Sequence, residues 1–132
     1  MIENVLYPPI EALVDAHKIL IAETGSPEGI RNIEGLAASI ARAEQIRAYT
    51  GGQPTIFHLT ASIAFGIVKM HHPFVDGNKR VAFISILMML ELNGYYFDAS
   101  EHDAADTILA VAAGEMTENK FVEWIKNNSY EQ

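Results

Sequence analysis

The sequence predicts an all-α fold, a compact single-domain bundle of about six helices that spans residues 1–132. Apolar residues recur at helical spacing through most of the chain. Clusters of glycine, proline and asparagine separate these apolar segments. The chain has 132 residues, of which 49% are hydrophobic, and this length fits one domain with one core.

Two helices are expected in the first part of the chain. The first covers residues 10–23, where Pro9 suits the first turn and the Gly/Pro-rich residues 25–29 end the helix. The second covers residues 33–49, and residues 50–54 form the loop after it. The spacing predicts inward-facing Ile10, Leu13, Val14, Leu20, Ile21, Leu36, Ile40, Ala43 and Ile46, and outward-facing Arg42, Glu44 and Arg47.

The third and fourth expected helices, residues 55–71 and 78–93, are apolar nearly all round. Helices of this kind lie at the centre of a bundle. Pro73 ends the third helix, and the short connection predicts that the two helices pack as antiparallel neighbours. The loop at residues 72–78 then lies at one end of the bundle, which is a usual place for a pocket.

Two further helices, residues 100–113 and 117–127, follow a short extended piece at residues 95–97. Ser100 and Thr117 are typical N-cap residues. The inner face of the last helix is expected to contain Phe121, Trp124 and Ile125. We expect the last few residues of the chain to be frayed.

Composition excludes several classes of protein. A formal net charge of −8 argues against general nucleic-acid binding, which needs clustered lysine and arginine. The absence of cysteine excludes disulfides and thiolate metal sites. The longest uncharged apolar run, residues 81–90, is shorter than the ~20 residues that span a bilayer, and no secretion signal is visible. These features predict a cytoplasmic protein.

The most informative segment is residues 72–80, His-Pro-Phe-Val-Asp-Gly-Asn-Lys-Arg. It places an imidazole, a carboxylate, an amide and two cations between the two most apolar segments of the chain. A polar cluster that joins two buried segments is energetically costly unless it has a use. The segment therefore predicts a catalytic loop that handles a phosphate-bearing substrate.

Each polar residue of this loop suits a step of phosphate chemistry. His72 titrates near neutrality and is the natural general base, while Asp76 can bind Mg²⁺. Lys79 and Arg80 begin a helix, where cations cost roughly 0.3–1 kcal/mol each unless an anion binds there. Gly77 lets the backbone approach that anion. Together these groups indicate phosphoryl or nucleotidyl transfer.

A structural interpretation of the same residues stays open at this point. Asp-Gly-Asn is an ordinary turn, and either Asp76 or Asn78 can serve as a helix cap. Lys79 and Arg80 can be solvated surface residues.

Residues 72–80 resemble the signature loop of the Fic/Doc superfamily. The Fic branch has glycine in place of Lys79 and a second arginine in place of Phe83, and both departures match the Doc (death-on-curing) branch. Supporting similarity runs through Gly29-Ile30-Arg31, Glu34-Gly35-Leu36, Ile40-Ala41-Arg42 and Leu92-Asn93-Gly94-Tyr95.

The resemblance implies a small all-helical toxin that uses ATP and Mg²⁺ to phosphorylate a threonine of elongation factor Tu and so halts translation. Its catalytic residues would be His72, Asp76 and Arg80, with His72 as base and Asp76 serving the metal or the incoming hydroxyl. Gly77, Asn78, Lys79 and Arg80 would form the cofactor-binding set, and Phe74 would anchor the loop in the core. A cognate antitoxin that fills an apolar groove is the expected partner.

Two alternatives within the superfamily stay open. One is a Fic-type enzyme that transfers AMP to a protein hydroxyl, and the other is an inactive binding module of the same fold. Lys79 discriminates between the two transfers, because its side chain fills space that the AMP-transferring pose needs and adds a charge for a differently oriented ATP.

Other titratable residues are assigned structural roles. Adjacent His71 and His72 at a helix end point apart and do not easily share a metal ion. The group of His102, Asp103 and Asp106 fits a polar first turn better than an HD-type metal site. We expect His17 and His58 to be hydrogen-bonded core groups.

Residues 24–29 match a short self-inhibitory pattern of some Fic proteins. They fall in a Gly/Pro-rich loop instead of on a helix, which favours coincidence. The alternative is an internal brake in which Glu28 reaches Arg80.

Overall fold

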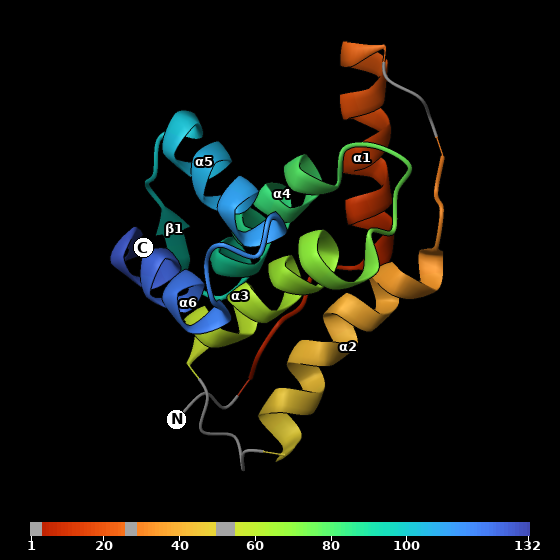
Figure 1. Cartoon of the computed structure of the whole chain (residues 1–132). Helices are drawn as coiled ribbons and strands as arrows, with labels where there is room; N and C mark the ends of the chain where they lie inside the picture. Colours follow the sequence, from red (N-terminus) through yellow and green to blue (C-terminus); the bar gives the residue numbers. More distant parts are fainter. Residues whose placement is uncertain (1–3, 26–28, 50–54) are drawn as a thin grey trace.

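The computed structural model describes residues 4–25, 29–49 and 55–132. Six α-helices, one π-helical segment and two short strands make up the described part of the chain (Figure 1). In chain order they are α1 (Ile10–Thr24), α2 (Ile33–Tyr49), α3 (Ile56–Phe65), η1 (Gly66–His71), α4 (Asn78–Leu92), β1 (Tyr95–Phe97), α5 (Glu101–Ala112), α6 (Glu118–Asn127) and β2 (Ser129–Glu131). The predicted all-α fold is confirmed, and no described helix is both long and apolar enough to cross a membrane.

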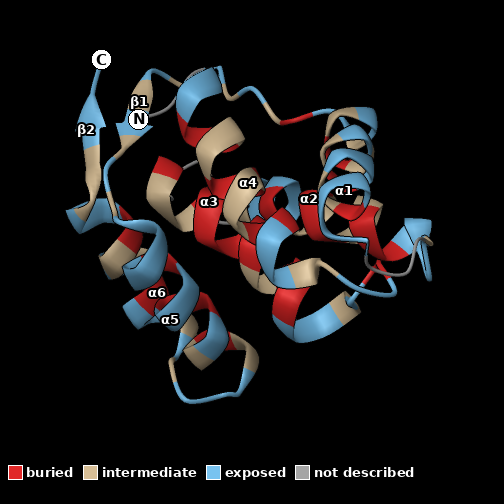
Figure 2. Ribbon diagram, turned by 90° about the horizontal axis from the view of Figure 1, so that it is seen from above, coloured by how far each residue is buried: buried red, intermediate tan, exposed pale blue. Residues whose placement is uncertain are grey.

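Helix α3 lies at the centre of the bundle, as predicted. Seven of its ten residues are buried, and it packs against α2, α4 and α6 (Figure 2). Helix α4 is less enclosed than its apolar sequence indicated. One side packs on α3, while Phe83, Ile84 and Leu87 on another side stay partly exposed. This half-open side of α4 faces a pocket described below.

Local capping explains where several helices begin. The side-chain oxygens of Thr55, Ser100 and Thr117 accept hydrogen bonds from backbone N–H groups three residues later, at 3.2, 3.0 and 3.2 Å. Each bond satisfies a donor that has no partner within the helix. The N-caps predicted at Ser100 and Thr117 are therefore confirmed.

The expected helix at residues 55–71 changes its winding before it ends. Its last turn is the π-helix η1, and His72 N donates to Ile67 O, five residues earlier, over 3.2 Å. Helix α2 approaches this turn closely, because a Cβ atom at Gly35 would lie 3.0 Å from His71 Cβ and one at Gly66 would lie 2.9 Å from Ser39 Oγ. The wider turn sets the position from which residues 72–80, the predicted catalytic loop, leave the core.

The expectation that the end of the chain frays is wrong. Strand β2 pairs antiparallel with β1, with Tyr95 opposite Glu131 and Tyr96 opposite Tyr130. The two paired tyrosine rings also stack, with centroids 5.4 Å apart. The chain end is held because its backbone groups have partners in β1, more than thirty residues earlier.

The expectation that Arg42 faces outward is also wrong. Its guanidinium forms a fork with Glu118, at 2.6 and 2.7 Å, and donates to the backbone and hydroxyl oxygens of Ser62 at 3.1 and 3.0 Å. It also lies over the Phe65 ring, 5.3 Å from the centroid. The hydrogen bonds to Glu118 raise the pKa of Arg42, so the guanidinium stays charged. One side chain thus joins α2, α3 and α6.

Arg42→Ala is expected to lower the free energy of unfolding by about 1–3 kcal/mol, because it leaves the half-buried Glu118 carboxylate without its partner. Urea unfolding measures this loss. Arg42→Lys should recover only part of it, since an ammonium cannot form the two-pronged contact. A free energy within about 0.5 kcal/mol of wild type would show that the network contributes little.

Candidate active site

The first half of the catalytic loop is held by backbone bonds from the segment before α2. Arg31 N and Asn32 N both donate to Pro73 O, over 2.7 and 2.9 Å. Val75 N donates to Gly29 O over 3.2 Å, and Ile30 forms a β-bridge with Phe74. The loop between η1 and α4 therefore has a fixed path although it belongs to neither helix.

Phe74 anchors the loop in the core, as the resemblance implied. Its side chain is fully buried. Asn78 closes the loop around it: Asn78 Oδ1 accepts from Phe74 N over 3.0 Å, and Asn78 Nδ2 donates to Phe74 O over 2.9 Å. The amide of Asn78 thus shapes the loop, and the phosphate contact expected of it stays a prediction.

His17 in α1 holds the second half of the loop. The residue is 3% exposed, and its Nε2 donates to Asp76 O over 2.8 Å. The ring stacks on Phe74 with centroids 3.9 Å apart. A Cβ atom at Gly77 would lie 3.3 Å from His17 Cδ2, and φ of Gly77 is 91°, so both space and backbone conformation favour glycine there. The expectation of a hydrogen-bonded core histidine is confirmed for His17, whereas His58 is only partly buried.

His72, the first residue of this loop, has a strained backbone conformation. Its φ is 44°, and it is the one residue other than glycine with positive φ among residues 4–25, 29–49 and 55–132. The left-handed conformation costs a residue with a Cβ about 1–2 kcal/mol. Such strain is characteristic of functional sites. The residue is exposed, as are Asp76, Lys79 and Arg80, so the four residues predicted to act on a substrate are open to one.

Helix α4 begins without a side-chain cap, unlike α3, α5 and α6. Its N-cap is Gly77, and the first backbone bond of the helix runs from Val81 N to Gly77 O over 3.0 Å. The N–H groups of Asn78, Lys79 and Arg80 come before that bond and have no partner within the helix. Free donors, the helix dipole and two exposed cations together make this end of α4 suited to a phosphate.

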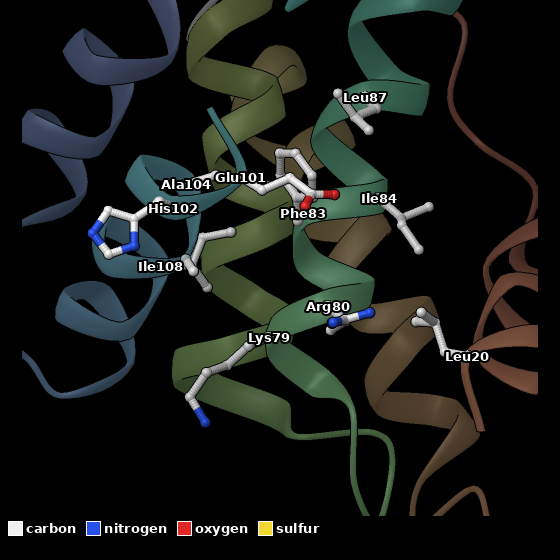
Figure 3. Close-up of a pocket in the computed structure, with 11 residues that line it drawn as sticks. Leu20, Lys79, Arg80, Phe83, Ile84, Leu87, Glu101, His102, Ala104 and Ile108 are labelled. Carbon is white, nitrogen blue, oxygen red and sulfur yellow. The ribbon is translucent and has the colours of Figure 1, made fainter. Parts of the chain in front are cut away.

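A pocket of about 610 Å³ continues from these cations between α1, α4 and α5 (Figure 3). Lys79 and Arg80 lie at one end, and Glu101 reaches in over Phe83 from the start of α5 (Figure 3). The apolar lining consists of Leu20, Phe83, Ile84, Leu87, Ala104, Ala105 and Ile108. Sequence reasoning predicted a pocket near the loop but not these walls. The sequence did contain a signal for these walls, namely the apolar residues Phe83, Ile84 and Leu87 on the outward side of α4.

Within residues 72–80, the carboxylates that could bind a metal ion come down to one, Asp76. In the described part of the chain, no three histidine or carboxylate side chains come together as a metal-binding group. This arrangement still fits Mg²⁺, which commonly takes one or two carboxylates together with substrate phosphates and water. Asp76 is exposed beside the open start of α4 and is the residue that would hold the ion.

The other titratable groups belong to surface structure. On α5, the exposed His102 Nε2 lies 3.3 Å from Asp106 Oδ2, and Asp103 accepts a hydrogen bond from Trp124 Nε1 over 3.1 Å. This is the polar first turn expected from the sequence. Glu28, which the internal-brake alternative needs, lies outside the described residues, as do residues 50–54.

Comparison with known proteins matches the residues that build this site. The model of the Fic/DOC family matches residues 7–90, a range that contains α1 to α3, the whole catalytic loop and most of α4. No curated protein matches the sequence. Because the match covers well over half of the chain, the protein belongs to the Fic/DOC family, whose members are typically transferases that act on proteins and use ATP.

Proposed function

We propose that this protein is a toxin-type kinase that transfers the γ-phosphate of ATP to a threonine or serine hydroxyl of a translation factor, elongation factor Tu. The reaction uses Mg²⁺ in the cytoplasm and blocks translation. His72 is the general base, Asp76 holds Mg²⁺ and Arg80 stabilises the transferred phosphate. Gly77, Lys79 and Arg80 bind the ATP phosphates together with the backbone of Asn78.

The distribution of charged and apolar groups along the pocket is the observation that carries this proposal. Cations and free N–H groups gather at the loop end, while the rest of the pocket is largely apolar. Phe83 stands where the Fic branch has a second arginine, so that branch's second phosphate clamp is missing there. A nucleoside suits the apolar walls, and its phosphates suit the loop end. In this orientation the γ-phosphate, and not the α-phosphate, lies towards His72.

The transfer follows from these positions. His72 accepts the proton of the target hydroxyl as the hydroxyl oxygen forms a bond to the γ-phosphorus. The bond between that phosphorus and the β–γ bridging oxygen breaks, and ADP leaves. The cations Lys79 and Arg80 offset the charge on the transferred group and on ADP, and Mg²⁺, which Asp76 would hold, would supply further positive charge there. At the opposite end of the pocket, Glu101 supplies an acceptor for the ribose hydroxyls.

The decisive experiment uses purified protein, elongation factor Tu, Mg²⁺ and ATP labelled at either the α- or the γ-phosphate. Label on the target from the γ position supports the kinase. Label from the α position would instead establish AMP transfer. If neither label reaches any protein, either with elongation factor Tu or in a complete bacterial lysate, the protein is a binding module and the proposal fails.

We further propose a separate antitoxin whose amphipathic helix occupies the pocket between α1, α4 and α5. The apolar row of α4 suits such a helix, and an occupant there would displace the nucleotide. Expression of the active protein alone should therefore stop growth. Normal growth would argue against a separate antitoxin, and a Glu28→Gly variant far more active than wild type would instead indicate self-inhibition.

Asp76→Asn is expected to remove most of the activity together with its dependence on Mg²⁺. An amide binds a hard dication much more weakly than a carboxylate does. The measurement is a Mg²⁺ titration of the transfer rate, with the exposed Asp15→Asn on α1 as matched control. If Asp76→Asn gives the wild-type titration curve and turnover, Asp76 is a turn residue only.

A further inference from the structure

One buried histidine outside the loop controls the peptide bond that leads into α4. His17 contacts the loop in three ways: its ring stacks on Phe74, Nε2 bonds to Asp76 O over 2.8 Å, and the ring edge lies against Gly77. Because a carbonyl oxygen can only accept, the ring hydrogen of this contact is on Nε2. The tautomer of His17 is therefore fixed by the loop backbone.

This bond also fixes the direction of the next N–H group. A trans peptide is planar, and its C=O and N–H point in opposite directions. The Asp76 carbonyl points at α1, so the Gly77 N–H points away from α1. Gly77 is the N-cap of α4, and its N–H precedes the free donors of the first turn.

The peptide between Asp76 and Gly77 needs such a restraint. Gly77 has φ 91° and no side chain, so rotation of this peptide plane meets little steric resistance. A rotated peptide would turn its carbonyl towards the start of α4, where a negative oxygen repels a phosphate. The hydrogen bond to His17 selects the orientation in which the Gly77 N–H, and not the Asp76 carbonyl, lies towards the start of α4.

We infer that His17 is a positioning residue, which holds the Asp76–Gly77 peptide so that the Gly77 N–H faces the phosphate bound at the start of α4. The inference rests on the proposed function only in taking that phosphate to belong to ATP. A donor held in place before reaction stabilises the transition state more than the bound substrate. Loss of the His17 bond should therefore lower kcat more than it changes KM.

Two variants of the full chain separate the hydrogen bond from the packing. His17→Phe keeps a ring that can stack on Phe74 but removes the donor, and His17→Gln places an amide N–H near the position of Nε2. Leu13→Ala, also buried on α1, is the control for a destabilised helix. We expect His17→Phe to lower kcat about 10–100-fold with little change in KM for ATP, and His17→Gln to recover most of the loss. Equal kcat for His17→Phe and Leu13→Ala, measured well below both Tm values, would overturn the inference.

Nuclear magnetic resonance tests the same inference without any transfer activity. In ¹⁵N-labelled wild-type protein, the His17 ring should carry its hydrogen on Nε2. Addition of Mg²⁺ and ATP should shift the Gly77 amide signal in wild type and much less in His17→Phe. A neutral ring with its hydrogen on Nδ1, or an equal Gly77 shift in both proteins, would contradict the inference. If wild-type protein transfers no phosphate, the proposed function fails, but these signals still decide the role of His17. If His17→Phe does not fold, the tautomer in wild-type protein and the behaviour of His17→Gln decide the role of His17.

Discussion

His72→Ala is expected to abolish phosphate transfer while leaving the fold intact. His72 is the one imidazole in the exposed loop, and loss of a general base typically lowers the rate ~10²–10⁴-fold. The side chain is exposed, so its removal leaves no cavity in the core. The rate is measured with γ-labelled ATP, and the fold by circular dichroism and Tm.

His71→Ala is the matched control for this experiment. His71 is the neighbouring imidazole, and it packs beside Gly35 of α2. His71→Ala should keep most of the transfer activity even if it lowers Tm. If His72→Ala transfers phosphate within a few-fold of wild type, another group removes the hydroxyl proton and the assignment of the base is wrong.

Lys79→Gly should lose γ-phosphate transfer. Lys79 lies at the open start of α4 and at the loop end of the pocket. In the proposed function its charge holds ATP with the γ-phosphate towards His72. Glycine removes both that charge and the bulk of the side chain. The freed space admits the opposite orientation of ATP and with it weak AMP transfer, limited by Phe83 in place of a second arginine. Mass spectrometry of the target distinguishes added phosphate from added AMP.

Lys79→Met separates charge from bulk in this prediction. Methionine keeps a long side chain without the charge, so Lys79→Met should lose phosphate transfer and gain no AMP transfer. Unchanged phosphorylation by Lys79→Gly would show that Lys79 does not orient ATP. Attachment of AMP by the wild-type protein would also show that Lys79 does not orient ATP for γ-phosphate transfer.

The parts of the fold that could be predicted are stabilised by interactions between residues that lie close together in the sequence. Helix positions followed from apolar spacing and from local caps such as Ser100 and Thr117, whose hydrogen bonds span three residues. The catalytic loop could be found for the same reason, because its nine residues are contiguous. Its anchor Phe74 also lies in that stretch and is buried as expected.

The missed features depend on residues that are far apart in the chain. Arg42 looked like a surface residue because its partner Glu118 is 76 positions away. Strand β2 has no strong pattern of its own and depends on β1 for its hydrogen bonds. The pocket combines α1, α4 and α5, so its walls follow from packing and not from a motif. The role of Asn78 in closing the loop was missed for a different reason. The sequence places an asparagine there, and an asparagine can either close a loop or bind a phosphate.

The tether between residues 29–32 and the catalytic loop has a consequence for how this protein can diverge. The bonds from Arg31, Asn32 and Val75 use main-chain atoms only, while the side chains of Ile30, Arg31 and Val75 are exposed. Mutations of these three side chains therefore change the surface beside His72 without breaking the bonds that shape the loop. A lineage can in this way acquire a new protein target while its reaction chemistry stays the same.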